Sequence, residues 1–259
     1  MNAGERDELI VQLKLIQLRD NNFYLKDIGL LTSIKLYKEY QNFPKGIDIN
    51  NVVNYSNIQL INLTNQCGIA KAGPRSKADT IINGEHISVK SNNYAPPALV
   101  NHTTRPGFEF AGKHAGGDID KLDSIIEKYW VKRVNKLIGE DVSNTHMHSP
   151  FKTEKKVIRP FLNYFLFDGT GSGLSNMPAS RILVFTDPLN IDTWSIYDRA
   201  NAIDIYWDKL IFSLRAKKGM PSNYPNITSK KLIPLKSSIA KWTKYIDGDY
   251  RGALHIRTK

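Results

Sequence analysis

The sequence predicts an α/β protein in which a mixed central sheet is flanked by helices. Three observations favour this class: two amphipathic stretches with the period of a helix, a β-branched hairpin signal, and a short apolar run typical of a buried strand. The chain has 259 residues, enough for one domain with a full core or for two closely joined subdomains. Its apolar content of 41% and charged content of 24% are ordinary for a globular protein.

The first elements along the chain are predicted to be helices. Residues 4–19 place apolar side chains at i, i+4 and i+7, acidic residues gather in the first turn, and Asn2 can cap the helix. Residues 27–40 are predicted to form a second helix. Residues 48–61 are rich in Asn with β-branched residues between, a pattern that predicts short strands and turns.

Residues 80–90, TIINGEHISVK, carry the strongest local signal in the sequence. Asn83-Gly84 is a two-residue hairpin turn, and the runs on both sides have the character of strands. The start of the first strand lies beside the end of the second, so Asp79 and Lys90 are predicted to meet at one end of the sheet. Ser88 shares a strand face with Lys90 because side chains repeat every two residues.

The rest of the chain mixes irregular segments with regular ones. Residues 91–118 carry three Pro and four Gly and are predicted to be a long irregular segment. Residues 119–138 have the apolar face of an amphipathic helix, and residues 182–185 are predicted to form a buried strand. Residues 194–259 suggest further strands and turns, with strict alternation over 253–257.

Two clusters that resemble ligand sites are weak on inspection. Gly169, Gly171 and Gly173 lack the Lys-Ser/Thr ending of a phosphate loop and the spacing of a dinucleotide site, so no nucleotide cofactor is expected. His146 and His148 have no further ligand at zinc spacing and are interpreted as loop histidines.

Composition also bears on compartment. Cys67 is the single cysteine, so no internal disulfide can form, and it is expected to be a small buried residue. The N-terminus lacks the apolar core of a signal peptide, and no run approaches the ~20 apolar residues of a membrane span. We therefore expect a cytoplasmic protein with no membrane segment. The four tryptophans are expected in the core: Trp130, Trp194, Trp207 and Trp242.

The charge balance points to a polyanionic partner. The chain has 36 basic and 25 acidic residues, a net charge of +11. From residue 205 to the end, twelve Lys or Arg face three Asp and no Glu, which is +9. A concentrated basic excess favours nucleic acid, and the alternative is a Lys-rich surface without a partner. Sequence-independent affinity is expected from Lys217, Lys218, Lys230 and Lys231.

Asp79 and Lys90 suit metal-dependent hydrolysis of a phosphodiester. That reaction needs a carboxylate to hold Mg²⁺ and a cation near the attacking water. The alternative is an exposed cross-strand ion pair that stabilises the fold by only a few tenths of a kcal/mol.

These residues resemble a known family. Residues 73–103, GPRSKADTIINGEHISVKSNNYAPPALVNHT, are similar to the core of PD-(D/E)xK nucleases, in which an Asp precedes one strand and a (D/E)-x-K triplet ends the next. They are most similar to type II restriction endonucleases that carry an S-x-K triplet, a small-residue segment and a Leu-x-Asn turn. Residues 2–16, NAGERDELIVQLKLI, also resemble the opening helix of that subgroup. The two blocks cover about a fifth of the chain.

The resemblance implies roles for the hairpin residues. Asp79 corresponds to the metal-binding carboxylate, and Lys90 to the residue at the attacking water. Ser88 stands where the superfamily usually has a second acid, and a hydroxyl is a far poorer Mg²⁺ ligand, so the number of metal ions stays open.

Two other groups are candidates to complete the metal site. They are the backbone carbonyl of Val89 and a carboxylate from the first helix, either Glu5 or Glu8, which lie one turn apart. The choice between these two acids stays open at this point. Glu85 follows the turn directly and is expected to be exposed.

The segment after Lys90 is expected to face the DNA. Short polar groups and Arg contact phosphates and base edges, although each of them could equally satisfy loop backbone. The candidates are Asn92, Asn93, Asn101, His102, Thr103, Thr104 and Arg105, with Asn176, Arg181, Arg251, His255 and Arg257 as a second group.

The resemblance implies a Mg²⁺-dependent endonuclease that cuts double-stranded DNA at a short palindrome and acts as a homodimer. Residues 1–259 are then a single nuclease domain, with a catalytic core half over 1–138 and a basic half over 139–259 for additional DNA contacts or dimerisation. The alternatives are a repair or recombination nuclease of the same chemistry, a non-catalytic DNA-binding protein that lost a metal ligand at Ser88, and an unrelated basic protein.

Overall fold

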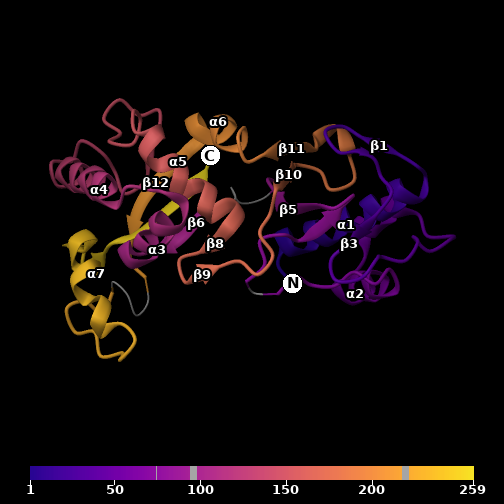
Figure 1. The fold of residues 1–259 in the computed structure, drawn as a ribbon, viewed down its shortest axis with the longest axis horizontal. Helices are drawn as coiled ribbons and strands as arrows, with labels where there is room; N and C mark the ends of the chain where they lie inside the picture. Colours follow the sequence, from indigo (N-terminus) through magenta and orange to yellow (C-terminus); the bar gives the residue numbers. More distant parts are fainter. Residues whose placement is uncertain (74, 94–97, 218–221) are drawn as a thin grey trace. The chain divides into compact units, whose positions relative to one another are not determined.

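The computed structural model describes residues 1–73, 75–93, 98–217 and 222–259 and has the expected mixed α/β character. The chain divides into two compact units. Unit 1 comprises Met1–Pro97 and Ser175–Ala200, and unit 2 comprises Ala98–Leu174 and Asn201–Lys259. The chain passes between the units three times, so they do not coincide with halves divided at residues 138 and 139 (Figure 1).

Unit 1 is built on a five-stranded sheet with the order β11-β10-β5-β4-β3. Its strands are β3 (Ile34–Lys35), β4 (Thr80–Ile82), β5 (Glu85–Ser91), β10 (Arg181–Phe185) and β11 (Ser195–Asp198). The central pair β10–β5 is parallel and the other pairs are antiparallel. The sheet is therefore mixed, and the buried strand predicted at residues 182–185 is confirmed as β10.

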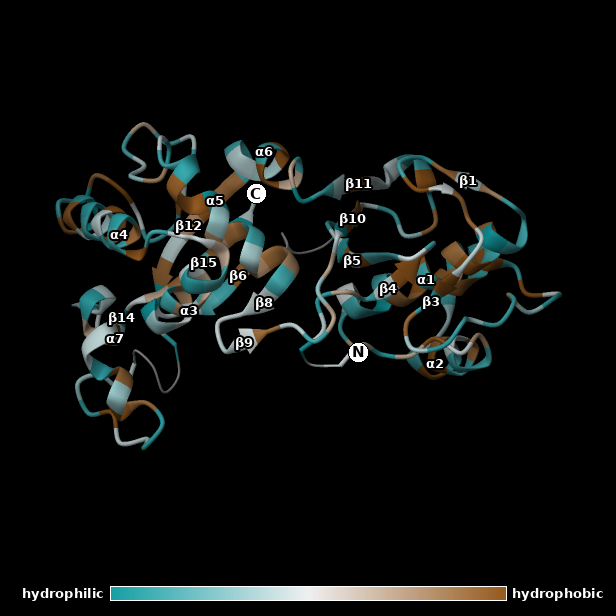
Figure 2. Cartoon of the chain, in the orientation of Figure 1, coloured by the Kyte–Doolittle hydropathy of each residue, from teal (hydrophilic) through white to brown (hydrophobic). Residues whose placement is uncertain are grey.

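The predicted N-terminal helix is confirmed as α1 (Ala3–Asp20), which packs against β5. Its start is fixed by a capping box: Glu5 N donates to Asn2 Oδ1 at 2.9 Å, and Asn2 N donates to Glu5 Oε2 at 3.2 Å. The buried face includes Ile10, Leu13 and Ile16. Figure 2 shows this hydrophobic band on α1 and the neighbouring strands at the centre of unit 1.

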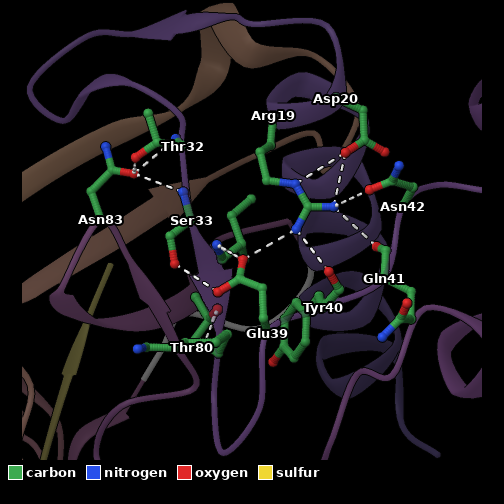
Figure 3. Close-up of polar contacts among 12 residues, drawn as sticks. Arg19, Asp20, Thr32, Ser33, Glu39, Tyr40, Gln41, Asn42, Thr80 and Asn83 are labelled. Atoms are coloured by element: carbon green, nitrogen blue, oxygen red, sulfur yellow. Dashed lines mark hydrogen bonds and ion pairs between the residues drawn. The ribbon is translucent and has the colours of Figure 1, made fainter.

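The helix predicted over residues 27–40 is wrong. The segment contains only the short strands β2 (Gly29–Leu30) and β3, with β1 (Tyr24–Leu25) pairing with β2. Asp27 and Gly29 have φ of 68° and 99°, left-handed conformations that a helix cannot continue through. Glu39 then caps the next turn, because its carboxylate accepts from Ile34 N and Ser33 Oγ, each at 2.7 Å (Figure 3).

The strands predicted over residues 48–61 are also wrong. The segment forms a 3₁₀ helix, η1 (Ile49–Asn54), followed by α2 (Asn57–Gln66). Ser56 and Gln59 make a second capping box, which explains why an Asn-rich stretch starts a helix here. Local capping chemistry prevails over the weak strand pattern.

The predicted hairpin is confirmed as β4 and β5, with Thr80 paired to Ile87. Asn83 and Gly84 have φ of 50° and 87°, as a two-residue turn of this kind requires. The turn is also anchored from outside: Asn83 Oδ1 accepts from Thr32 N at 2.9 Å, Thr32 Oγ1 at 3.0 Å and Ser33 N at 3.2 Å (Figure 3). The hairpin is thus held at its tip as well as along its strands.

Unit 2 is built on a four-stranded antiparallel sheet with the order β6-β15-β12-β7. Its strands are β6 (Ala98–Thr103), β7 (Val142–Ser143), β12 (Leu210–Arg215) and β15 (Ala253–Thr258). One face of the β12–β15 pair carries buried apolar side chains, and Phe151 stacks on Phe212 there with ring centroids 4.1 Å apart.

Helices supply the rest of the unit 2 core. They are α3 (Arg105–Ala115), α4 (Ile119–Val134), α5 (Lys155–Asn163), α6 (Ala202–Tyr206) and α7 (Lys236–Trp242). Phe108 of α3 lies at the centre, in contact with the rings of Phe161, Phe165 and Trp242. The remaining elements are η2 (Tyr164–Asp168), β8 (Gly169–Thr170), β9 (Gly173–Leu174), η3 (Ile191–Thr193), η4 (Trp207–Lys209), η5 (Ile233–Leu235), β13 (Lys244–Ile246) and β14 (Asp249–Arg251).

The irregular segment predicted over residues 91–118 is wrong for most of its length, because it contains β6 and α3. Pro106 lies in the first turn of α3, where its missing N–H costs nothing, and Gly116 ends that helix with a φ of 71°. Pro106 and Gly116 therefore mark the two ends of α3, and Pro96 and Pro97 lie outside the described residues. The next helix is confirmed as α4, and the C-terminal region holds α6, η4, η5 and α7 besides its strands.

Burial agrees with several expectations. Cys67 is buried, as are Trp130, Trp207 and Trp242, whereas Trp194 is partly buried against the unit 1 core. Within the described parts of the chain, the helices are all too short or too polar to span a bilayer.

The basic excess belongs almost entirely to unit 2. Unit 1 has 13 basic and 12 acidic residues, a formal charge of +1, and unit 2 has 23 basic and 13 acidic residues, a formal charge of +10. The hairpin with Asp79 and Lys90 therefore belongs to the nearly neutral unit 1.

Candidate active site

The structure brings Asp79 and Lys90 together at the end of the β4–β5 hairpin, as the turn predicts. Lys90 Nζ lies 3.5 Å from Asp79 Oδ2 and donates to the carbonyl oxygen of Val89 at 2.9 Å. The side chains of Lys90 and Asp79 are 37% and 22% exposed, so both groups keep access to solvent.

Asp79 is held firmly by the second strand. Its backbone N donates to Ile87 O at 2.9 Å, and its Oδ2 accepts from Val89 N at 2.7 Å and from Ser88 Oγ at 3.3 Å. Ser88 is 1% exposed, and its buried hydroxyl helps to fix the orientation of the Asp79 carboxylate. These contacts use Oδ2 and leave Oδ1 as the oxygen that can face a cation.

The ammonium of Lys90 stays charged in this setting. Burial lowers its pKa, but the carboxylates of Asp79 and Glu8 outweigh that effect and raise the pKa above its ordinary value. The group is therefore a fixed positive charge at neutral pH.

Glu8 of α1 is the helix acid that approaches this pair. Burial raises its pKa to about 7, the Lys90 charge opposes the shift, and the nearby Asp79 carboxylate adds to it. Glu5 is engaged elsewhere, since its carboxylate accepts from Asn2 N and lies 3.4 Å from Lys71 Nζ. The geometry thus favours Glu8 over Glu5 as the third group of the site.

A cavity of about 420 Å³ lies beside these groups. It is lined by side chains from α1, from α2 and from the segment before Asp79: Met1, Glu5, Glu8, Leu9, Gln12, Ile61, Thr64, Asn65, Ile69, Ala70, Lys71, Ala72 and Asp79. Gln12, one of the lining residues, is held in place because its Oε1 accepts from Tyr40 Oη at 3.2 Å. Burial raises the pKa of that Tyr40 hydroxyl to about 12, so it remains a donor.

Asp7 is a site-adjacent acid that sequence reasoning missed. It is 4% exposed, and its Oδ2 accepts from Ser91 Oγ at 3.0 Å and Asn93 Nδ2 at 3.5 Å. It ties α1 to the end of β5, one residue beyond Lys90. Ile10 and Val11 follow it at i+3 and i+4, so the helical period already places Asp7 on the buried face.

The donors present fit a magnesium ion. Across the described residues, no three His, Cys, Asp or Glu side chains lie close enough together to hold one metal ion. Mg²⁺ is commonly held by one or two carboxylates, with water and substrate phosphate filling the other positions. Asp79 and Glu8, with the Val89 carbonyl, provide such a set, whereas the Ser88 hydroxyl donates to Asp79 and serves as its support.

Three of the residues expected at the DNA are buried. Arg105 is 3% exposed, and its guanidinium binds Asp123 with Nε at 2.8 Å and Nη2 at 2.7 Å, while Glu109 also contacts it. Thr103 and Thr104 are 7% and 4% exposed. The structure therefore removes these three from the accessible polar groups.

Other candidates remain accessible in unit 1. Asn92 and Asn93 are exposed at the end of β5, next to Lys90, and Asn176 is exposed on a loop. Arg181 is committed to the protein, because its Nη1 donates to Asp27 O at 2.9 Å and its Nε lies 3.7 Å from Glu85 Oε2. Glu85 lies at the turn end of the hairpin, away from Asp79, with its side chain 43% exposed.

The remaining candidates gather in unit 2. Asn101 is exposed on β6, His102 stacks on His255, and Arg251 and Arg257 pair with Glu140 and Asp141. Arg215 joins this group, although the sequence alone did not single it out. Of the lysines expected to bind phosphate, Lys217, Lys230 and Lys231 are exposed, and Lys218 lies outside the described residues.

The two weak clusters have local explanations. Gly169 and Gly173 belong to the short pair β8–β9, and a Cβ on Gly171 would lie 2.7 Å from Thr103 Cγ2, so packing accounts for this glycine. His146 and His148 lie on a loop, where His148 N donates to His146 Nδ1 at 3.2 Å.

A comparison of the chain with protein families, curated proteins and solved structures found no match.

Proposed function

We propose that the chain is a Mg²⁺-dependent endonuclease that hydrolyses double-stranded DNA at a short palindromic sequence, in the manner of type II restriction enzymes. The supporting observation is the convergence of Asp79, Lys90 and Glu8, from a hairpin and a helix far apart in sequence. A carboxyl group with a raised pKa, as Glu8 has, beside a lysine and a cavity is typical of catalytic sites.

Each group has a role in this reaction. Lys90, held by Asp79 and the Val89 carbonyl, keeps its positive charge and orients a water molecule toward the phosphorus atom. The water oxygen bonds to phosphorus as the bond to the leaving oxygen breaks. The attacking water gives up a proton to solvent and the leaving oxygen takes one from solvent, which leaves a phosphate on one end and a hydroxyl on the other. Magnesium, when bound by Asp79 and Glu8, supplies positive charge for the phosphate oxygens.

The fold and the charge distribution support the proposal in different ways. A mixed sheet with α1 packed on β5 is compatible with a restriction-endonuclease-like arrangement, and that finer fold is part of the proposal. The formal charge of +10 on unit 2 suits a polyanion. The homodimer, in which each subunit cuts one strand, rests on the family resemblance.

The experiment is a digest of unmethylated genomic-scale DNA with and without Mg²⁺, with the wild type beside Lys90→Ala. Lys38→Ala is the matched control, since Lys38 is an exposed lysine of the same unit. Discrete fragments that need Mg²⁺, persist with Lys38→Ala and vanish with Lys90→Ala support the proposal.

Two other results would favour the alternatives. Fragments without a common end sequence indicate a repair or recombination nuclease. A wild type that shifts DNA on a gel and leaves it intact in Mg²⁺ indicates a non-catalytic DNA-binding protein.

A further inference from the structure

The polar face of the unit 2 sheet contains a local distortion around two histidines. His255 lies where the β15–β6 pairing shifts register between Leu254 and Ile256. His102, on the facing strand, has a φ of 39°, a conformation that residues other than glycine rarely adopt. The two rings stack with centroids 4.5 Å apart and planes inclined by 14°. Bulges and strained residues of this kind are frequent where a protein aims a side chain at a ligand.

An unpaired buried atom lies at the same place. Among the described residues, five buried side-chain atoms have no hydrogen-bond partner, and His255 Nδ1 is one of them. His255 is 8% exposed, so its unpaired nitrogen is a cost that an apolar ring would avoid. Packing alone therefore gives no reason for a histidine at this position.

Arginines surround the histidine pair and are held in place by acids. Arg215 Nη2 donates to Asp141 Oδ1 at 2.8 Å, and Arg257 Nη2 donates to Asp141 Oδ2 at 3.2 Å. Ser213 pairs directly with His255 across β12 and β15, and its Oγ accepts from Arg215 Nε at 2.9 Å. One carboxylate thus orients two guanidiniums beside the rings, and each guanidinium has further N–H groups to donate.

The imidazoles are uncharged at neutral pH. Burial lowers the pKa of His255 to about 4, and the neighbouring His102, Arg215 and Arg257 add to this effect against the opposing charge of Asp141. Burial also lowers the pKa of His102, with Arg215 and Lys217. A neutral imidazole has one N–H donor and one acceptor nitrogen, which suits the edge of a base better than a phosphate.

We infer that His102, which is partly exposed and backed by the stacked ring of the buried His255, reads the edge of a base pair in duplex DNA, while Arg215 and Arg257 bind the adjacent phosphates. The inference rests on the proposed function for its ligand, double-stranded DNA, and assigns sequence discrimination to the polar face of the unit 2 sheet. The formal charge of +10 on this unit supplies the complementarity that such a ligand needs.

The test uses the full chain with Lys90→Ala, which keeps the DNA intact while sequences are selected from a random duplex pool. His102→Asn is added to this parent and compared with His114→Asn, because His114 is an exposed histidine of the same unit. The parent and the His114 control should enrich one common sequence. His102→Asn should lose or change the preference at one base position, with affinity for the parent's sequence lowered roughly tenfold or more and random-duplex affinity unchanged.

A second pair of measurements separates reading from phosphate binding and from folding. Arg257→Gln should weaken binding to every duplex and reduce the salt slope by about one. His102→Asn should melt at the same temperature as the parent, because Asn tolerates the left-handed conformation. If that variant does not fold, His255→Ala replaces it, since it removes the ring on which His102 stacks.

The inference is overturned if His102→Asn and His255→Ala enrich the same sequence as the parent, or if the parent shows no preference. Cleavage by the wild type is measured separately. A protein that selects a sequence and cuts no DNA contradicts the nuclease proposal alone. A protein that cuts a site still selected after His102→Asn contradicts the base-reading role alone.

Discussion

At the scale of single residues, the candidate active site depends on how neighbours set the charge of Lys90 and Glu8 and orient Asp79. Lys90 is kept cationic by two carboxylates, Asp79 is oriented by a backbone N–H and a buried hydroxyl, and Glu8 is driven toward neutrality by burial. The same residue types on an open surface would form an ion pair of little energetic weight. Burial and close approach therefore distinguish these three residues from an ordinary surface ion pair.

Glu8 should make stability depend on pH. Its folded-state pKa of about 7 lies above the ordinary value of 4.5, so the folded protein binds a proton that the unfolded chain releases. Without metal, stability should be highest below about pH 4.5 with respect to this group and should decline as pH rises to about 7.

Glu8→Gln removes that dependence. We expect its melting temperature, measured in chelator, to exceed that of the wild type at pH 8 and to match it at pH 5. Glu5→Gln is the control, because burial raises the pKa of Glu8 whereas the Asn2 backbone lowers that of Glu5. Equal melting temperatures of wild type and Glu8→Gln at pH 8 would contradict the assignment of Glu8 to a buried site.

Arg105 should matter for stability and have little effect on DNA affinity. Replacing it with Met leaves Asp123 without its main partner, and breaking a buried pair of this kind typically costs about 3–5 kcal/mol. Chemical denaturation of Arg105→Met should show such a loss, while the folded fraction binds duplex DNA as the wild type does. A stable variant with weak DNA binding would restore Arg105 as a DNA contact.

At the scale of elements, α1 and β5 make the site together. The helix contributes Glu8 from its first turns, and the strand contributes Lys90 at its end. Asp7 joins them through Ser91 and Asn93. The two elements are held in register by this buried contact as well as by their shared core.

Asp7→Ala should therefore disturb the packing of α1 against the end of β5, although Asp7 is not one of the three site groups. An unpaired hydroxyl on Ser91 and a lost acceptor should reduce stability by about 1–3 kcal/mol. We expect DNA cleavage to fall as well, through a lower kcat with little change in KM, and Asp7→Asn to recover most of both. If kcat stays at the wild-type value while stability falls, the contact is only structural.

At the scale of the whole molecule, the two units differ sharply in charge. Unit 1 carries a formal charge of +1 and unit 2 a formal charge of +10, so unit 2 should dominate non-specific binding to DNA. The basic count of the sequence alone does not separate the two, because unit 1 takes in residues 175–200 from the middle of the chain.

Paired lysine substitutions test this division. Replacing Lys230 and Lys231 of unit 2 with Ala should weaken binding to random duplex, and each lost phosphate contact should lower the slope of log K against log salt by about 0.9. Replacing Lys35 and Lys38 of unit 1 should leave both quantities unchanged. All four side chains are exposed, so neither change should disturb folding. Equal effects of the two pairs would contradict the assignment.

The sequence predicted an element correctly where the conformation of a few neighbouring residues determines the structure. The turn Asn83-Gly84 adopts the conformations that only such residues tolerate, so it aligned Asp79 with Lys90 before any tertiary contact was known. The helical period likewise predicted α1 and α4. The failures at residues 27–40, 48–61 and 91–118 arose where caps and left-handed residues outweigh a weak period.

The sequence was sufficient for the mixed α/β class, the hairpin and the meeting of Asp79 with Lys90, because turn geometry and side-chain period act over a few residues. It left open which acid of the first helix approaches them, it missed Asp7, and it counted Arg105 among the exposed groups. Only the tertiary structure decided these points, together with the stacking of His102 on His255 and the division of charge between the units. The physical reason is that burial, and the pKa shifts that follow from it, depend on packing between segments distant in the chain.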